Sequence, residues 1–125
     1  MGTHDPKHAI DTISRLMELA PYGVYICDAD SNVVFANQIG RKFYGSILKQ
    51  SGAAEWVKLG EMFTLDGVLV LPADFPMSRA IRGEIVHEMQ YEIRKGKESV
   101  RVAISAHPLH EDGKIVGAMS IHRYA

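Results

Sequence analysis

The sequence has one cysteine, Cys27, among 125 residues, which excludes an intramolecular disulfide and argues against a zinc site built on cysteines. It has no apolar run near the roughly 18 residues of a membrane-spanning helix. The net charge of −1 gives no excess of one sign for nucleic acid or an anionic membrane. No glycine-rich loop ends in the Gly-Lys-Ser/Thr of a phosphate site. We therefore expect a cytoplasmic protein that contacts neither nucleic acid nor membrane.

The N-terminal part predicts a short lead followed by a helix. Residues 1–7 are polar and are expected to be flexible, which leaves residues 8–125 as a single domain. From His8 to Ala20, apolar residues recur at helical spacing, and Pro21 ends the pattern. The apolar stripe of this predicted amphipathic helix contains Ile10, Ile13, Leu16 and Met17.

The next segment predicts a β-hairpin and then helices. Val24 to Cys27 and Val33 to Ala36 are β-rich runs on either side of a polar turn. Asn37 is placed to cap a short helix that ends near Gly45. Residues 46–71 show mixed signals, and we expect short helices and loops there. Pro72 to Gly83 predicts a further helix, capped by Asp74.

The last forty residues predict three strands in a meander. Apolar and polar residues alternate from His87 to Lys95 and from Val100 to Ala106, and Pro108 is expected to end the second strand. The third strand runs from Ile115 to Ile121, after a turn at 111–113. With the hairpin, these strands predict an α+β domain with a five-stranded antiparallel sheet.

Five stretches, in this order, resemble the PAS domain family over nearly the whole chain. They are Leu19–Asp28, Val33–Asn37, Asp74–Glu84 with its Pro, Arg-Ala and Gly-Glu, Ser105–Leu109, and Asp112–Ala118. The resemblance implies a PAS fold, with short helices on one face of the sheet and an N-terminal amphipathic helix. It also implies a sensing and dimerisation input module of a larger bacterial signalling protein, such as a histidine kinase, with an output domain as partner.

Strand alternation and the resemblance to flavin-binding members select the residues expected to face the helices. They are Tyr25, Cys27, Val33, Phe35, Met89, Tyr91, Ile93, Val102, Ile104, Met119 and Ile121. Two interpretations remain open: these residues fill the core, or they line a pocket for a small ligand. The N-terminal helix can pack on its own sheet and also pair its stripe with a second copy, because a helix can use neighbouring faces. The resemblance implies a homodimer.

Cofactor chemistry and catalysis find little support in the sequence. Flavin-adduct members carry their cysteine on a mid-domain helix, whereas Cys27 lies on the first predicted strand, where a buried small hydrophobe is expected. Haem binding is not expected either, and His87 is the remaining candidate ligand. His107 and His122 have the outward parity and are expected on the surface. Ser105 and His107 have no acid partner placed by the sequence, so we expect no enzyme.

Overall fold

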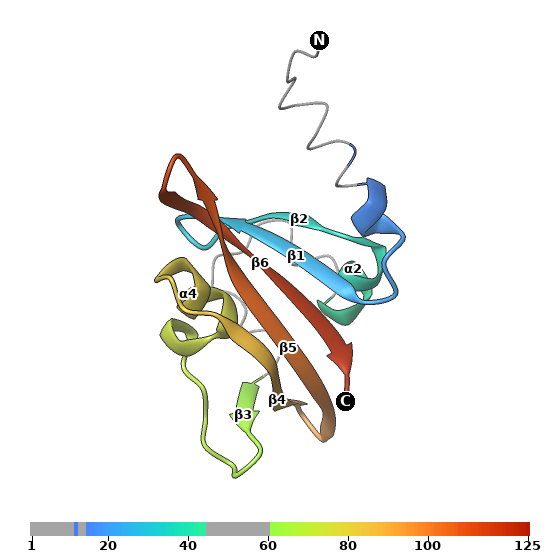
Figure 1. Cartoon of the computed structure of the whole chain (residues 1–125). Helices are drawn as coiled ribbons and strands as arrows, with labels where there is room; N and C mark the ends of the chain where they lie inside the picture. The colour runs from blue at the N-terminus through green and yellow to red at the C-terminus, as the bar shows by residue number, and fades with distance from the viewer. Residues whose placement is uncertain (1–11, 13–14, 45–60) are drawn as a thin grey trace.

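The computed structural model describes residue 12, residues 15–44 and residues 61–125 of the chain. Its main feature is one antiparallel sheet with strands in the order β2-β1-β6-β5-β4-β3 (Figure 1). The strands are β1 (Gly23–Asp28), β2 (Val33–Ala36), β3 (Glu61–Thr64), β4 (Val86–Lys95), β5 (Glu98–Glu111) and β6 (Lys114–Tyr124). The helices are α2 (Gln38–Tyr44), the 3-10 helix η3 (Pro72–Asp74) and α4 (Pro76–Ile81). The expected α+β class with an antiparallel sheet is confirmed.

Within the described residues the sheet has six strands, not the five that the sequence predicted. The additional strand is β3, which pairs with β4 and lies where we expected only short helices and loops. After β3 the chain folds back on it, because the Val70 amide donates to the Met62 carbonyl at 2.8 Å. The rest of that expectation, residues 46–60, lies outside the described residues.

The predicted turns form as expected. Between β1 and β2, the Asp28 carboxylate accepts hydrogen bonds from the amides of Asp30 and Asn32 at 2.9 and 3.0 Å. Between β5 and β6, Asp112 and Gly113 have φ angles of 52° and 76°. Two left-handed residues in a two-residue loop match the twist of the flanking strands.

Strand β5 does not end at Pro108 but continues to Glu111. Pro108 pairs with Ala118 of β6, whereas β4 pairs with β5 only as far as Ala106. At Pro108 the strand therefore has a neighbour on one side only. Proline is tolerated at such an edge, because a missing N–H on the open side costs no ladder hydrogen bond.

The core lies between one face of the sheet and helix α4. Helix α4 packs on β5 and β6, and it buries Pro76, Met77 and Ala80. On the sheet side, the buried apolar residues are Tyr25, Cys27, Met62, Val86, Tyr91, Val102, Ile104, Ala106 and Ala118. Of the described helices, none is both long enough and apolar enough to cross a membrane.

Asn37 joins the first strand, the second helix and the N-terminal segment. Its Oδ1 accepts hydrogen bonds from the amides of Gly40, at 2.7 Å, and Val24, at 2.9 Å. The first bond is the helix cap that the sequence predicted. Its Nδ2 donates to the carbonyls of Met17 and Tyr22, both at 2.8 Å. The side chain is fully buried, and all four of these bonds are made.

Helix α4 starts differently from the prediction. Phe75 holds the N-cap position without a side-chain hydrogen bond, and Asp74 ends the separate helix η3. Pro72 and Pro76 each begin their own short helix, so Asp74 lies inside the first of them and caps neither. Gly83 ends α4 as predicted, with φ of 95° and its amide donating to the Ala80 carbonyl at 2.9 Å.

Strand β4 is irregular near its start. The pairing with β5 shifts register between Val86 and Met89, and Glu88 has a φ of 49°, in the left-handed region. The Glu88 amide donates to the Ser105 hydroxyl at 2.9 Å, and its carboxylate pairs with Arg123 of β6. This ion pair lowers the pKa of the Glu88 carboxyl. The bulge therefore connects β4 to β6 across β5.

The described part of the N-terminal segment is helical at residue 12 and residues 15–18. Leu16 is 66% exposed, and Met17 is partly buried. The other two predicted dimer residues, Ile10 and Ile13, lie outside the described residues, as does the predicted lead at residues 1–7.

Candidate functional site

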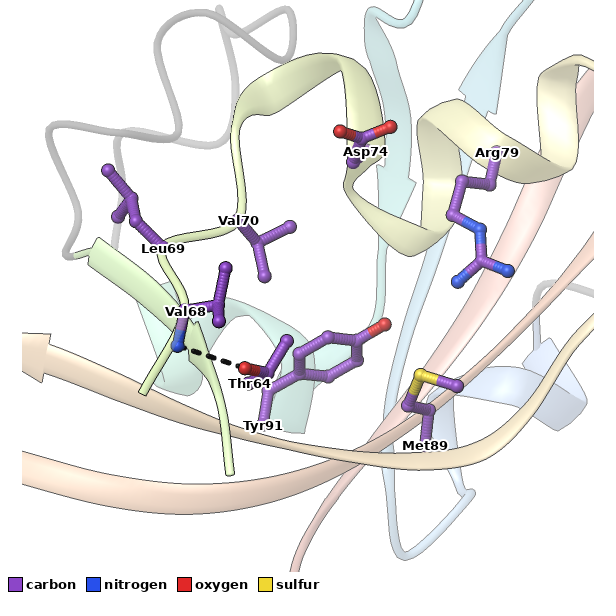
Figure 2. Close-up of a pocket in the computed structure, with 8 residues that line it drawn as sticks. All are labelled: Thr64, Val68, Leu69, Val70, Asp74, Arg79, Met89 and Tyr91. Atoms are coloured by element: carbon purple, nitrogen blue, oxygen red, sulfur yellow. Dashed lines mark hydrogen bonds between the residues drawn. The ribbon is translucent and has the colours of Figure 1, made fainter. Parts of the chain in front are cut away.

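A hollow of about 290 Å³ lies beside β4, where the sheet meets η3, α4 and the chain that follows β3. Figure 2 shows its lining side chains, which come from four separate segments of the sequence. The lining residues are Thr64, Val68, Leu69, Val70, Asp74, Arg79, Met89 and Tyr91. The walls are mainly apolar with a few polar groups, which is the composition of a small-molecule site.

The floor of the hollow comes from strand pairing. Tyr91 lies opposite Thr64 of β3, and Met89 lies two residues away on the same strand face. Tyr91 is buried, whereas Met89, which follows the bulge in β4, is 44% exposed. Both residues were predicted to face a pocket, and both line this hollow.

One wall comes from the hairpin that follows β3. The Thr64 amide donates to the Val68 carbonyl at 2.8 Å, and Phe63 pairs with Leu69. The Thr64 hydroxyl donates to the Asp66 carboxylate at 2.5 Å and accepts from the Val68 amide at 3.0 Å. The Thr64 hydroxyl therefore makes both of its hydrogen bonds within the turn, and these bonds hold the apolar residues 68–70 over Tyr91.

The opposite wall carries a network of four charges. The Arg79 Nε lies 3.3 Å from Glu84, and the other Glu84 oxygen lies 3.3 Å from Arg82. Arg82 also lies 3.7 Å from Asp74. Gly83 turns the chain back so that the Glu84 amide bonds the Arg79 carbonyl at 3.1 Å, which places this carboxylate between the two arginines.

Arg79 and Tyr91 face each other across the hollow (Figure 2). Burial raises the pKa of the Tyr91 hydroxyl, while the positive charge of Arg79 and a hydrogen bond from its side chain oppose that rise. The hydroxyl is therefore protonated at neutral pH and can donate to a ligand. The guanidinium is permanently charged and can only donate.

The other pocket candidates lie elsewhere. Tyr25, Cys27, Val102 and Ile104 are buried in the core, with Val33 packed against them, so the inward orientation of these five is correct. None of them lines the hollow. Whether any of them contacts a ligand stays a prediction.

Three orientation predictions were wrong. Phe35 pairs with Ile26, because an extra residue in β2, Val34, shifts the register between Ile26 and Cys27, and Phe35 therefore lies on the opposite sheet face from Tyr25. Met119 and Ile121 pair with Ile26 and Val24, so they too lie on that face.

His122 was predicted on the surface, but it is buried in the core. It lies on the same face of β6 as Ser120, and its Nε2 is 3.0 Å from the Ser120 hydroxyl. Its ring meets the Tyr25 ring edge-on, with centroids 4.5 Å apart. Burial lowers the pKa of His122 to about 3, so the imidazole is neutral in the folded protein. By contrast His87, the candidate haem ligand, is exposed, and it is not among the residues of the hollow.

Sequence reasoning missed most of the hollow. The wall at 68–70 could have been found, because Asp66-Gly67 between two apolar runs is a hairpin signal. Arg79 was noted only as a family-like position, and Asp74 only as a cap. Among the residues that the structure describes, no group of three or more His, Cys, Asp or Glu side chains could hold a metal ion.

The comparison with protein-family models shows which family the chain belongs to. A family model described as PAS fold matches residues 17–123. The chain belongs to the PAS family. No curated protein matches this PAS domain in sequence.

Solved structures agree with the fold. A PAS domain of an HTR-like protein from Haloarcula marismortui is 15% identical, with a TM-score of 0.61 over 96% of this chain and 94% of that one. A PAS domain from a two-component sensor histidine kinase is 9% identical, with a TM-score of 0.63 over 97% and 100%.

A third similar structure is a domain of a sensory box sensor histidine kinase/response regulator from Geobacter sulfurreducens. It is 19% identical, with a TM-score of 0.58 over 98% of this chain and 99% of that one. PAS domains in sensor histidine kinases are signal-sensing modules.

Proposed function

We propose that this PAS domain is the cytoplasmic signal-input module of a larger bacterial signalling protein, a histidine kinase or similar regulator. In this proposal it binds a small ligand in the hollow beside β4 and acts on an output domain of the same protein. The observation that carries the proposal is the hollow itself, which places Tyr91, Met89 and Arg79 around an open space. Tyr25 and Ile104, by contrast, are fully buried in the core and do not line this hollow.

The position of the hollow suits a sensor. It lies over the edge of the sheet where β4 pairs with the short strand β3, which is joined to the sheet on one side only. A ligand that holds Tyr91 and residues 68–70 together stabilises one arrangement of this edge over others. It can shift such a balance only by its difference in affinity for the two arrangements.

The test is a ligand screen on the purified domain. A ligand present at 100 times its dissociation constant stabilises the folded state by about 2.7 kcal/mol, which a thermal-shift measurement detects. In ¹⁵N-labelled protein, the amide signals of Val70, Met89 and Tyr91 are expected to move most.

A variant that fills the hollow separates this site from others. Met89→Trp places a large ring at a lining position and is expected to abolish the thermal shift. Val116→Trp is the matched control, because Val116 is also an exposed strand residue but lies on β6, away from the hollow. Equal ligand responses in both variants, or no ligand in a broad screen, would overturn the proposal.

The second candidate function is a ligand-free dimerisation scaffold. It is supported by the exposure of Leu16 and Leu19, at 66% and 83%, beside the helical residues 15–18. Analytical ultracentrifugation is expected to show a concentration-dependent dimer that Leu16→Lys weakens. Val34→Lys is the control, since Val34 is 64% exposed on β2. A monomer at all concentrations would exclude the scaffold.

A further inference from the structure

We infer that the hollow takes a small carboxylic acid with a short apolar body, whose carboxylate binds Arg79 and Tyr91. This inference rests on the proposed function, because it names the chemistry of the ligand at that same site. Three observations support it: which polar groups line the hollow, which partners each of them already has, and how large and apolar the rest of the hollow is.

Two of the four polar lining residues are already engaged. The Thr64 hydroxyl is used by Asp66 and the Val68 amide. The Asp74 side chain is 68% exposed and lies near Arg82, so its charge is directed to solvent and to that arginine. Arg79 and Tyr91 are the other two polar groups of the lining, and they interact with each other. A protonated tyrosine beside an arginine presents donors to a ligand.

The Arg79 guanidinium contacts Glu84 along one edge and interacts with the Tyr91 hydroxyl along another, where a ligand carboxylate would accept from both residues. Glu84 contacts the Nε, and the same carboxylate is shared with Arg82, so it neutralises Arg79 only in part. The Arg79 side chain is 28% exposed, so its charge is partly withdrawn from water. Its terminal nitrogens point toward the Tyr91 hydroxyl (Figure 2). A planar, partly desolvated pair of donors matches the two oxygens of a carboxylate.

The other walls of the hollow limit the polarity and the size of the rest of the ligand. Val68, Leu69, Val70 and Met89 supply apolar surface. The hollow, of about 290 Å³, is just below the range of about 300–1,000 Å³ for ligand pockets, which leaves room for a short body only. Among the described residues of the lining, Arg79 is the one positively charged side chain, and the carboxylate of Asp74 lies beside Arg82, so a ligand with one carboxylate can pair with Arg79.

The first experiment compares acids with their neutral amides on the unaltered domain. Hexanoate and hexanamide, and benzoate and benzamide, differ in charge but hardly in shape. In ¹⁵N chemical-shift titrations at pH 7, we expect the acids to move the signals of Val70, Met89 and Tyr91. The amides are expected to bind about ten- to a hundredfold more weakly, because a hydrogen bond to a charged group is stronger than a neutral one.

The second experiment uses two arginines of the same charge network. Arg79→Gln is expected to weaken binding of the acids about ten- to a hundredfold and to leave the amides nearly unchanged. Arg82→Gln removes a charge from the same network but not from the lining, and it is expected to retain acid binding. Arg79→Lys keeps the charge without the planar fork and is expected to lie between the two.

The outcomes separate this inference from the proposed function. If amides and other neutral molecules bind the hollow as tightly as the acids, the carboxylate assignment is wrong while the ligand site stands. If neither acids, amides nor the broader screen move any signal of the lining, both proposals fail. The acid–amide comparison needs no variant, so it decides the matter even if Arg79→Gln does not fold.

Discussion

At the scale of single residues, Asn37 carries more hydrogen bonds across segments than its position in a short loop suggests. Four backbone groups depend on its side chain, and one of them, the Val24 amide, belongs to a buried strand residue. Removing a partner from a buried polar group costs about 1–3 kcal/mol for each group left unsatisfied.

We expect Asn37→Ala to lower the free energy of unfolding by about 3 kcal/mol, because it leaves several backbone groups without partners. Urea unfolding followed by circular dichroism measures this loss. Asn32→Ala is the control, since Asn32 is exposed in the first turn and is expected to change stability by less than about 0.5 kcal/mol. Equal losses in the two variants would contradict the role given to Asn37.

His122 makes the stability of the fold depend on pH in a definite direction. The unfolded histidine takes up a proton as the pH falls through about 6.5, whereas the folded one stays neutral until about 3. The unfolded state therefore binds more protons within this window, and the free energy of unfolding falls as the pH is lowered. One proton corresponds to about 1.4 kcal/mol per pH unit.

We expect His122→Gln to flatten this dependence between pH 6 and pH 4. The measurement is the free energy of unfolding in urea at several pH values, compared with the unaltered chain so that the carboxyl groups cancel. His107→Gln removes an exposed histidine and is the control for the loss of any imidazole. If both variants keep the slope of the unaltered chain, His122 is not the group responsible.

At the scale of elements, the contact between β1 and β6 depends on one glycine. A Cβ on Gly117 would overlap the Cys27 carbonyl oxygen and lie 3.4 Å from the Asp28 Cα. The obstructing atoms are backbone of the neighbouring strand, so they cannot move aside like a flexible side chain. Gly117 therefore sets how closely these two central strands approach.

We expect Gly117→Ala to destabilise the domain by about 3 kcal/mol or more, because β1 and β6 must separate locally. Thermal unfolding measures the effect. Gly96→Asn is the comparison, because Gly96 has a φ of 61° in the turn after β4 and nothing lies within 4 Å of an added Cβ. Asparagine tolerates that conformation, so a small loss of stability is expected there. A mild effect of Gly117→Ala would mean that the strands can slide apart.

The sequence predicted the turns and most strands, but not which face of β6 is buried. In β6 the larger apolar residues, Met119 and Ile121, alternate with small or polar ones, so hydrophobicity favoured the wrong face. The buried partners opposite Tyr25 and Cys27 are Ser120 and Ala118. A large ring on one strand leaves space only for a small residue opposite, and this pairing cannot be read from β6 alone.

At the scale of the whole molecule, the candidate site could not be derived from the sequence because its walls come from remote segments. Tyr91 and Met89 were found by alternation along one strand, which is a local pattern. Arg79 and residues 68–70 meet them only through the pairing of β3 with β4 and the placing of α4. No local sequence pattern predicts that these remote segments lie next to one another.

The sheet order predicts where the molecule opens first. Strands β1, β6, β5 and β4 have a partner on both sides, whereas β2 and β3 are the edges. In hydrogen exchange we expect the amides of β5 and β6 to exchange at least about ten times more slowly than those of β3. Saturating ligand in the hollow is expected to slow β3 selectively. Protection of β3 equal to that of β5 without ligand would contradict this order.

The burial of Cys27 has a practical consequence for studying the protein. Desolvation raises the pKa of its thiol to about 11, so at pH 7 only about one molecule in ten thousand carries the reactive thiolate. The native chain is therefore nearly inert to maleimide reagents while it stays folded. A second cysteine introduced on the surface, at Gln90 for example, can then take a fluorophore or spin label at one chosen place, with the native sulfur left untouched.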